Sequence, residues 1–173
     1  MIPMPRLLPV AAVALSLLVA GCTAPASRSA HPAATPQAMV AAIRAAAGEA
    51  EGELAVQPLR DPRVEDLRDE AARLQAAGDV AGAVRALDQA LAVVEGDPAL
   101  LQERAELAVL QQDFALAAQL AERAYALGAQ VGPLCRRHWA TLEQIRLREG
   151  DAAGVASART QIQGCRVAGP ERY

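Results

Sequence analysis

The sequence predicts an all-α fold of about three stacked helical hairpins. Apolar residues recur with the spacing of a helix, as at Leu67, Ala71 and Leu74. Residues 64–127 also align with themselves after a shift of 34 positions, which pairs Ala71 with Ala105. Aromatic residues make up only 2% of the chain. The core must therefore consist mostly of Ala, Leu and Val.

The N-terminus has the layout of an export signal. Residues 1–6 carry one arginine, residues 7–20 are apolar apart from Ser16, and the small residues Gly21 and Cys22 follow. The apolar run is shorter than the roughly 20 residues that a membrane-spanning helix needs. We therefore expect a signal peptide at residues 1–21 and an exported protein.

The end of this signal, Leu18 to Cys22, reads LVAGC and resembles the lipobox of bacterial lipoproteins. The resemblance implies cleavage before Cys22, a diacylglycerol on its thiol and an acylated new N-terminus. Several acyl chains anchor stably, whereas one binds only marginally. Thr23 stands where an aspartate favours inner-membrane retention in enteric lipoproteins, which implies the outer membrane, facing the periplasm. The alternative is an ordinary signal with a cysteine near its cleavage site.

Residues 22–36 predict a flexible tether, because they are rich in Ala, Pro, Ser and Thr and lack large apolar residues. Residues 37–60 predict a helix that starts near Thr35-Pro36 and an extended connector at Leu54 to Leu59. This helix carries Met39, Val40 and Ile43. It could cap the first hairpin or lie in the groove of the hairpin stack as an internal ligand.

The first two hairpins, at residues 61–96 and 97–131, have matching helix boundaries. Each opens at an Asp-Pro pair, Asp61-Pro62 and Asp97-Pro98, where the missing N–H of proline costs nothing. Each turns at an aspartate, Asp79 or Asp113, which can accept hydrogen bonds from the free N–H groups of the next helix.

Small residues recur where two helices would approach closely, at Ala71, Ala83 and Ala90 and then at Ala105, Ala117 and Ala124. This pattern resembles the tetratricopeptide repeat, in a degenerate form with Leu and Val at most of the bulky positions. The resemblance implies a short right-handed α-solenoid.

A third hairpin is expected at residues 132–165, followed by a tail at 166–173. It opens at Gly132-Pro133, and its turn at Gly150 arrives about one helical turn late, so its first helix should be longer. Ala152 to Gly164 should close the stack, because a terminal repeat needs a polar outer face.

The other two cysteines, Cys135 and Cys165, lie equally far before and after Gly150. They should face each other across the open end of the third hairpin and form a disulfide in an oxidising compartment. The alternative is a metal site with His138. Three ligands without a clear fourth make a poor zinc site, so no metal is expected.

The sequence favours neither an enzyme nor a nucleic-acid-binding protein. It has no catalytic triad order, no paired-carboxylate signature and no phosphate-binding loop. The formal net charge is −3 and stacking aromatics are scarce. We expect no cofactor and no small-molecule substrate. Residues 61–131 are acidic and residues 132–173 are basic, which could orient a partner or simply reflect a solvated surface.

The tetratricopeptide resemblance implies that a peptide or partner protein binds on the concave side, which the first helix of each hairpin lines. The positions expected to face this groove are Glu65, Arg68, Gln75, Gln102, Glu106, Gln144 and, depending on the register of the third hairpin, Arg136 or Arg137. An arginine there can bind a carboxylate through two hydrogen bonds. These residues could also be exposed polar side chains with no partner.

Together these features predict a lipid-anchored periplasmic adaptor that holds another protein of the cell envelope. The alternative is a small structural subunit, similar to a pilotin, of a secretion or pilus system that has no separate ligand groove.

Overall fold

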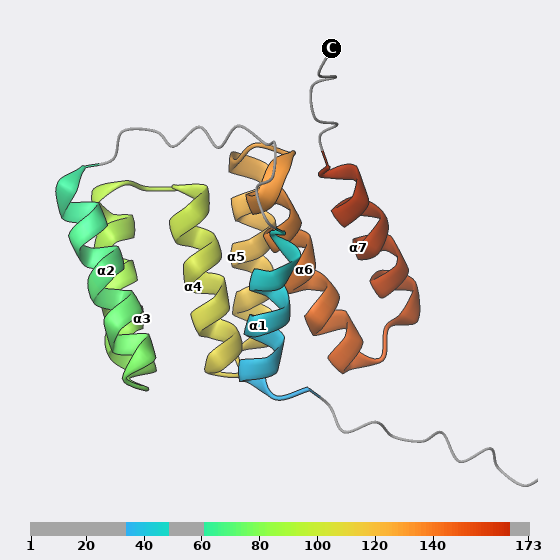
Figure 1. The fold of residues 1–173 in the computed structure, drawn as a ribbon, viewed down its shortest axis with the longest axis horizontal. Coiled ribbons are helices and arrows are strands. Elements are labelled where there is room, and N and C mark those ends of the chain that lie inside the picture. Colours follow the sequence, from blue (N-terminus) through green and yellow to red (C-terminus); the bar gives the residue numbers. More distant parts are fainter. Residues whose placement is uncertain (1–33, 49–60, 167–173) are drawn as a thin grey trace, which may run out of the picture. The chain divides into compact units, whose positions relative to one another are not determined.

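The computed structural model describes residues 34–48 and 61–166, which all belong to one compact unit, Ala33–Tyr173 (Figure 1). These residues form seven α-helices and no strand, so the predicted all-α, solenoid-like fold is confirmed. The signal peptide, Cys22, the tether as far as residue 33, the connector at Leu54 to Leu59 and the tail beyond Arg166 lie outside the described residues.

The described helices form three antiparallel hairpins and one additional N-terminal helix. In chain order they are α1 (Pro36–Ala46), α2 (Pro62–Ala76), α3 (Val80–Val93), α4 (Pro98–Leu110), α5 (Phe114–Leu127), α6 (Gly132–Glu149) and α7 (Ala152–Gly164). The hairpins are α2–α3, α4–α5 and α6–α7, and they stack through contacts of α3 with α4 and of α5 with α6. The first helix of the third hairpin is the longest, as its late turn predicts.

Aspartates cap the second helix of every hairpin. The carboxylate of each accepts a hydrogen bond from the backbone N–H three residues later, which satisfies one of the free donors at a helix N-terminus. The donor–acceptor distances are 2.7 Å for Asp79, 3.0 Å for Asp113 and 2.9 Å for Asp151. Asp61 and Asp97 cap the first helices α2 and α4: Asp61 accepts from the backbone N–H of Arg63, and Asp97 accepts from those of Ala99 and Leu100.

The three hairpin turns share one backbone geometry. Gly78, Gln112 and Gly150 have φ angles of 85°, 63° and 75°, and each precedes the capping aspartate. The left-handed conformation suits glycine and is unfavourable for other residues. Gln112 is therefore a position where the second turn is held in a less favourable backbone state.

Alanine allows the paired helices to approach closely. Ala83, Ala90, Ala117, Ala121 and Ala124 are fully buried between the helices of the first two hairpins and their neighbours. A methyl group is the largest side chain that fits where two helix backbones are this near. This packing explains why a chain almost without aromatic residues still has a continuous core.

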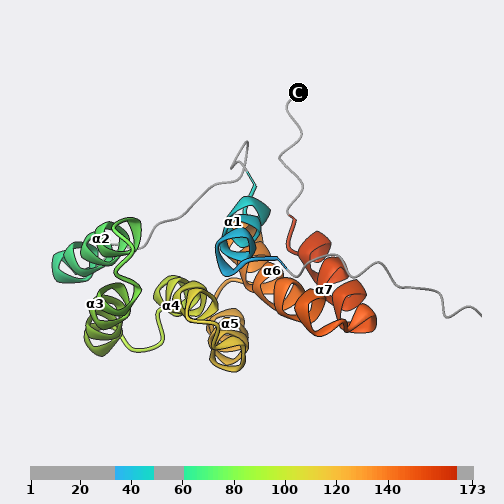
Figure 2. The same cartoon turned by 90° about the horizontal axis from the view of Figure 1, so that it is seen from below.

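The helix α1 packs against α6 and α4, on the same side of α4 as α2 (Figure 2). Its residues Met39, Val40 and Ile43 are buried with Val109 and Ile145 in one apolar cluster. The sequence left open whether this helix caps the first hairpin or lies in the groove of the stack. In the structure α1 lies on the groove side, which the first helix of each hairpin lines, and does not cap the first hairpin.

A disulfide closes the third hairpin. Cys135 in α6 and Cys165 after α7 are joined, with their Cα atoms 5.7 Å apart, in the pairing that the sequence predicts. The N–H of Gly132 also donates to the carbonyl of Cys165 at 2.7 Å. Because both thiols are consumed in this bond, they cannot act as thiolate ligands with His138.

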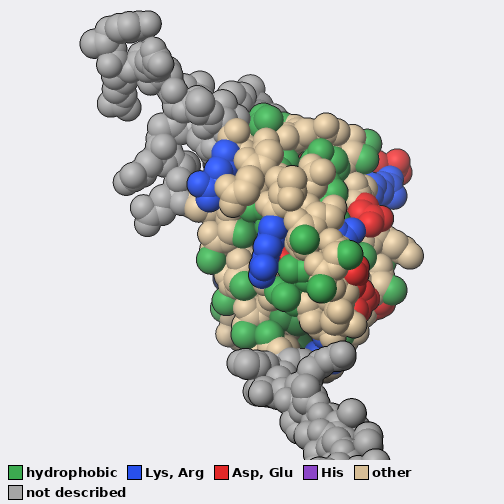
Figure 3. All heavy atoms as spheres, turned by 90° about the vertical axis from the view of Figure 1, so that its right-hand side faces the viewer, with side chains coloured by type: hydrophobic (Ala, Val, Ile, Leu, Met, Phe, Trp, Pro, Cys, Tyr) green, Lys and Arg blue, Asp and Glu red, His purple; other side chains and the backbone are tan. Residues whose placement is uncertain are grey.

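The outer side of α7 forms the end of the hairpin stack. In Figure 3, which looks at the α7 side, apolar side chains lie among polar and backbone atoms with arginines between them. Only Val155 and Ala158 of α7 are buried. This mixed surface agrees with the polar outer face expected of a terminal repeat. None of the described helices is both long and apolar enough to cross a bilayer.

Candidate functional site

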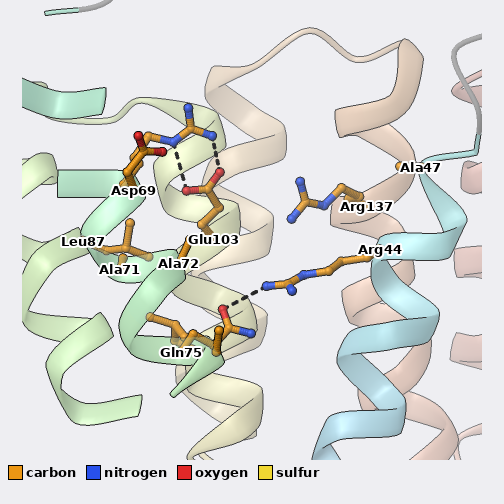
Figure 4. Close-up of a pocket in the computed structure, with 12 residues that line it drawn as sticks. Arg44, Ala47, Asp69, Ala71, Ala72, Gln75, Leu87, Glu103 and Arg137 are labelled. Atoms are coloured by element: carbon orange, nitrogen blue, oxygen red, sulfur yellow. Dashed lines mark hydrogen bonds and ion pairs between the residues drawn. The ribbon is translucent and has the colours of Figure 1, made fainter. Parts of the chain in front are cut away.

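An open groove of about 610 Å³ lies between α1 and α2, with α4 beneath it (Figure 4). We call it the α1–α2 groove. Its apolar lining consists of Ala47, Ala71, Ala72, Ala76, Leu87 and Leu107. Its polar lining consists of Arg44, Arg68, Asp69, Gln75, Glu103 and Arg137. The groove therefore combines small apolar side chains with a few charged groups, which is the usual composition of a binding site.

Two arginines at one wall of the groove share a single carboxylate. Glu106 of α4 is fully buried. Its Oε2 accepts from Arg44 Nε at 2.7 Å, and its Oε1 accepts from Arg137 Nε at 3.0 Å. Gln102 Nε2 also donates to Oε1 at 3.0 Å. A buried carboxylate is tolerated when it is paired and hydrogen-bonded in this way.

Arg44 links the two walls of the groove. Its Nη2 donates to Oε1 of Gln75 in α2 at 3.0 Å, as the dashed line in Figure 4 shows. The side chain of Arg44 is 47% exposed although its Nε contacts the buried Glu106. This guanidinium thus has one edge in the protein and one edge facing the groove.

Behind the arginines lies a buried polar network centred on Gln102. Its Nε2 donates to Glu106 and, at 2.9 Å, to Thr141 Oγ1, so its Oε1 is the atom that faces His138 Nδ1 at 2.8 Å. Oε1 can only accept, which requires the proton of the imidazole to be on Nδ1.

Burial lowers the pKa of His138 to about 4, and the positive charge of Arg137 adds to this effect. The charged form of a buried histidine is disfavoured because it loses hydration. His138 is therefore neutral near pH 7 and serves as a structural donor to Gln102. It is also fully buried, which separates it from the groove.

Arg68 forms the ion-pair cluster at the α2 end of the groove. Its Nε donates to Glu103 Oε2 at 3.1 Å, and its Nη1 donates to Glu65 Oε2 at 3.2 Å. Hydrogen bonding to Glu103 is the main cause of a raised pKa for Arg68. The guanidinium of Arg68 thus has two carboxylate partners, whereas Arg44 and Arg137 share one carboxylate.

The structure brings together some of the residues predicted to face a groove and buries others. Arg68, Gln75 and Arg137 line the α1–α2 groove. Glu65 lies beside it as a partner of Arg68. Gln144 lies on α6, half-buried, and is not among the lining residues.

Gln102 and Glu106, which were expected to face the groove, are instead buried, and of the two alternatives Arg136 and Arg137 it is Arg137 that lines the groove while Arg136 is buried. Glu106 and Arg136 contact α1, which packs where a ligand was expected, and Gln102 bonds to His138 and Thr141 of α6. Arg136 Nε donates to the carbonyl of Ala47 at 2.9 Å. Ala47 lies at the C-terminal end of α1, where a positive charge interacts favourably with the helix dipole. Glu106 pairs with Arg44 of the same helix.

Arg44, Asp69 and Glu103 are the charged groove residues that the sequence reasoning missed, and Arg44 shows why. It follows Ile43 directly, so its side chain lies at the border of the apolar face of α1. That position signals a partly buried arginine. Its carboxylate partner, however, is 62 residues away in sequence and could not be read from the local pattern.

No protein-family model matches the chain, and no curated protein matches it in sequence. Among solved structures, the chain is similar to the globular C-terminal domain of P. aeruginosa LpoP, with a TM-score of 0.56 and 29% sequence identity. The match covers 61% of this chain and 99% of the LpoP domain. Essentially the whole LpoP domain therefore aligns with the helical part of this chain.

Proposed function

We propose that this protein is a non-enzymatic lipoprotein of the bacterial cell envelope that binds a partner protein through the α1–α2 groove. The lipid is attached at Cys22, the anchor lies in the outer membrane, and the helical domain faces the periplasm. The partner is an envelope protein that presents a peptide segment to the groove. This proposal extends the tetratricopeptide resemblance of the sequence.

The observation that carries the proposal is the groove itself. Side chains from α1, α2, α4 and α6 converge on an open groove of about 610 Å³ whose polar groups are arginines, carboxylates and an amide. Such groups recognise peptides and their side chains. His138 is buried and the two described cysteines are joined to each other, so these groups do not provide a nucleophile or a general base at the groove.

The likeness to LpoP supports the same arrangement along the chain. The solved domain is the globular C-terminal domain of LpoP, and the helical domain here follows the proposed anchor and tether in the sequence. In the proposal, residues 22–36 supply the tether between the anchor and this domain.

Crosslinking tests the binding site. A photoreactive amino acid placed at Ala72, which lines the groove, should crosslink one partner in living cells. The matched control is Ala92, an exposed alanine of α3 that does not line the groove. A partner captured from Ala72 and absent from Ala92 supports the proposal. Capture from both positions in a fixed ratio would instead favour a structural subunit enclosed in a larger assembly.

Cell fractionation tests the anchor. The wild-type protein should be recovered with outer membranes, and Cys22→Ser should appear as soluble protein or as uncleaved precursor. A processed Cys22→Ser protein that still sediments with membranes would exclude the lipid anchor without affecting the groove.

A further inference from the structure

The wall formed by α1 and α6 has more positive than negative charge. Arg44 and Arg137 both direct their guanidinium groups to Glu106, which is one carboxylate for two cations. Glu106 lies behind them and is fully buried. The groove-facing side of this pair therefore carries one uncompensated positive charge.

Both arginines also have hydrogen-bond donors to spare. A guanidinium has five N–H donors. Within the described residues, Arg44 uses Nε towards Glu106 and Nη2 towards Gln75, and Arg137 uses Nε and Nη2 towards Glu106. The Nη1 groups of Arg44 and Arg137 make no hydrogen bond to any of the described residues. In Figure 4 both side chains extend from the α1 and α6 wall towards α2.

The opposite wall fits an extended peptide. Ala71, Ala72 and Ala76 line α2 between Arg68 and the helix end, so no bulky side chain fills the groove. From Arg68 to Ala76 this wall is about 12 Å long at 1.5 Å per residue. It matches about four residues of extended chain at roughly 3.3 Å each. Gln75 offers an amide that can hydrogen-bond a peptide backbone.

We infer that the α1–α2 groove binds an extended segment of the partner and that one internal Asp or Glu of this segment places its carboxylate between Arg44 and Arg137. The inference rests on the proposed function and gives the chemistry of the partner. An internal residue fits because the lining of the groove continues along α2 from Gln75 through Ala72 to Asp69, which leaves room for chain beyond the two arginines (Figure 4).

Binding requires only a small local change. The bond from Arg44 Nη2 to Gln75 is exposed, and an exposed hydrogen bond that can be replaced by water contributes little. The arriving carboxylate takes this donor and the spare donors of Arg137. Arg44 Nε and Arg137 Nε remain on Glu106, so the buried carboxylate stays paired throughout.

Peptide selection on the full-length protein in detergent tests the inference. A displayed library of random peptides is selected on wild type, Arg44→Gln, Arg137→Gln and the control Arg63→Gln. Arg63 is 73% exposed, pairs with Asp61 and lies outside the groove. Peptides selected on wild type and on the control should be enriched in Asp and Glu, and this enrichment should disappear on the two groove variants.

A synthetic peptide from the wild-type selection, amidated at its C-terminus, should bind at least about tenfold more weakly when its acidic residue is changed to the amide, as expected for one charge-assisted pair. Thermal melts confirm that each variant is folded. Because Arg44 is half-exposed, Arg44→Gln should fold. If Arg137→Gln does not fold, the loss or persistence of acidic enrichment on Arg44→Gln alone tests the inference.

Three results would overturn the inference. They are a wild-type selection without acidic enrichment, an enrichment that persists in folded Arg44→Gln, and binding that requires a free C-terminal carboxylate. In each of these cases peptides still bind to the protein, so the proposed peptide-binding function is not rejected, and crosslinking from Ala72 decides whether they occupy the groove. Failure to select any peptide would instead reject the proposed function and the inference with it.

Discussion

Acidification should destabilise the fold through His138. The pKa of this buried imidazole is about 4, compared with 6.5 for an unperturbed histidine, because burial and the charge of Arg137 oppose protonation. Between these two values the unfolded chain binds a proton that the folded chain does not. The free energy of unfolding therefore falls as the pH is lowered through this range.

The magnitude follows from the two pKa values. Each pH unit of difference corresponds to about 1.36 kcal/mol, so the full effect is about 3 kcal/mol. Linkage predicts a loss of about 1 kcal/mol by about pH 5.5 and of about 2 to 3 kcal/mol by about pH 4.5, relative to neutral pH.

Urea denaturation of wild type and His138→Asn over this pH range measures the effect. Asparagine keeps an N–H donor for Gln102 but does not titrate, so the difference between the two proteins isolates His138 from the carboxylates. The stability advantage of wild type should shrink as the pH falls. A constant difference, together with a His138 ring signal that titrates near 6.5 in NMR spectra, would refute the reasoning.

Four further substitutions test other parts of the structure. Replacing Cys135 and Cys165 by serine should cost about 3 to 4 kcal/mol on the chain-entropy model, measured as a lower urea midpoint, because their disulfide bridges a sequence separation of 30 residues. Ile43→Ala should cost about 2 to 5 kcal/mol and increase hydrogen exchange in α1, because Ile43 is fully buried. Glu106→Gln removes the buried countercharge of two arginines and should cost about 3 to 5 kcal/mol, measured by thermal melting. Gln112→Gly should stabilise by about 1 kcal/mol, because glycine relieves the left-handed turn.

Each of these predictions has its own contradicting result. Reduction of wild type should reproduce the midpoint of the double serine variant, and a midpoint that does not change would contradict the disulfide. An Ile43→Ala protein with unchanged exchange would show that α1 does not depend on this contact. A neutral Glu106→Gln change would mean that the carboxylate is not needed between the arginines. A destabilised Gln112→Gly protein would contradict the assigned turn geometry.

The hairpins could be predicted because their signals are local. Asp79 and Asp113 cap the helices that directly follow them, and the alanine spacing that brings two helices together repeats within 34 residues. The pairing of Cys135 with Cys165 follows from their symmetry about one turn. In all these features the interacting residues are close in sequence or related by one repeat.

The position of α1 could not be predicted, because it depends on contacts across the whole domain. Its apolar face, with Met39 and Ile43, could be read from the sequence, but the surface that buries it belongs to α4 and α6. The same lack of a local signal explains why Gln102 and Glu106 were wrongly expected to face the groove. Both side chains lie on the side of the hairpin stack that the first helix of each hairpin lines, as expected of a groove residue. Both are buried because α1 and α6 pack over them.

The docking of α1 also decides how force would travel through the protein. With the chain held at Cys22 as proposed, a pull from the membrane enters the domain at Pro36, the first residue of α1. The same helix contributes Arg44 to the wall of the groove. Tension between the anchor and a bound partner then enters through α1 and passes to α6, on which α1 packs and whose hairpin the disulfide closes.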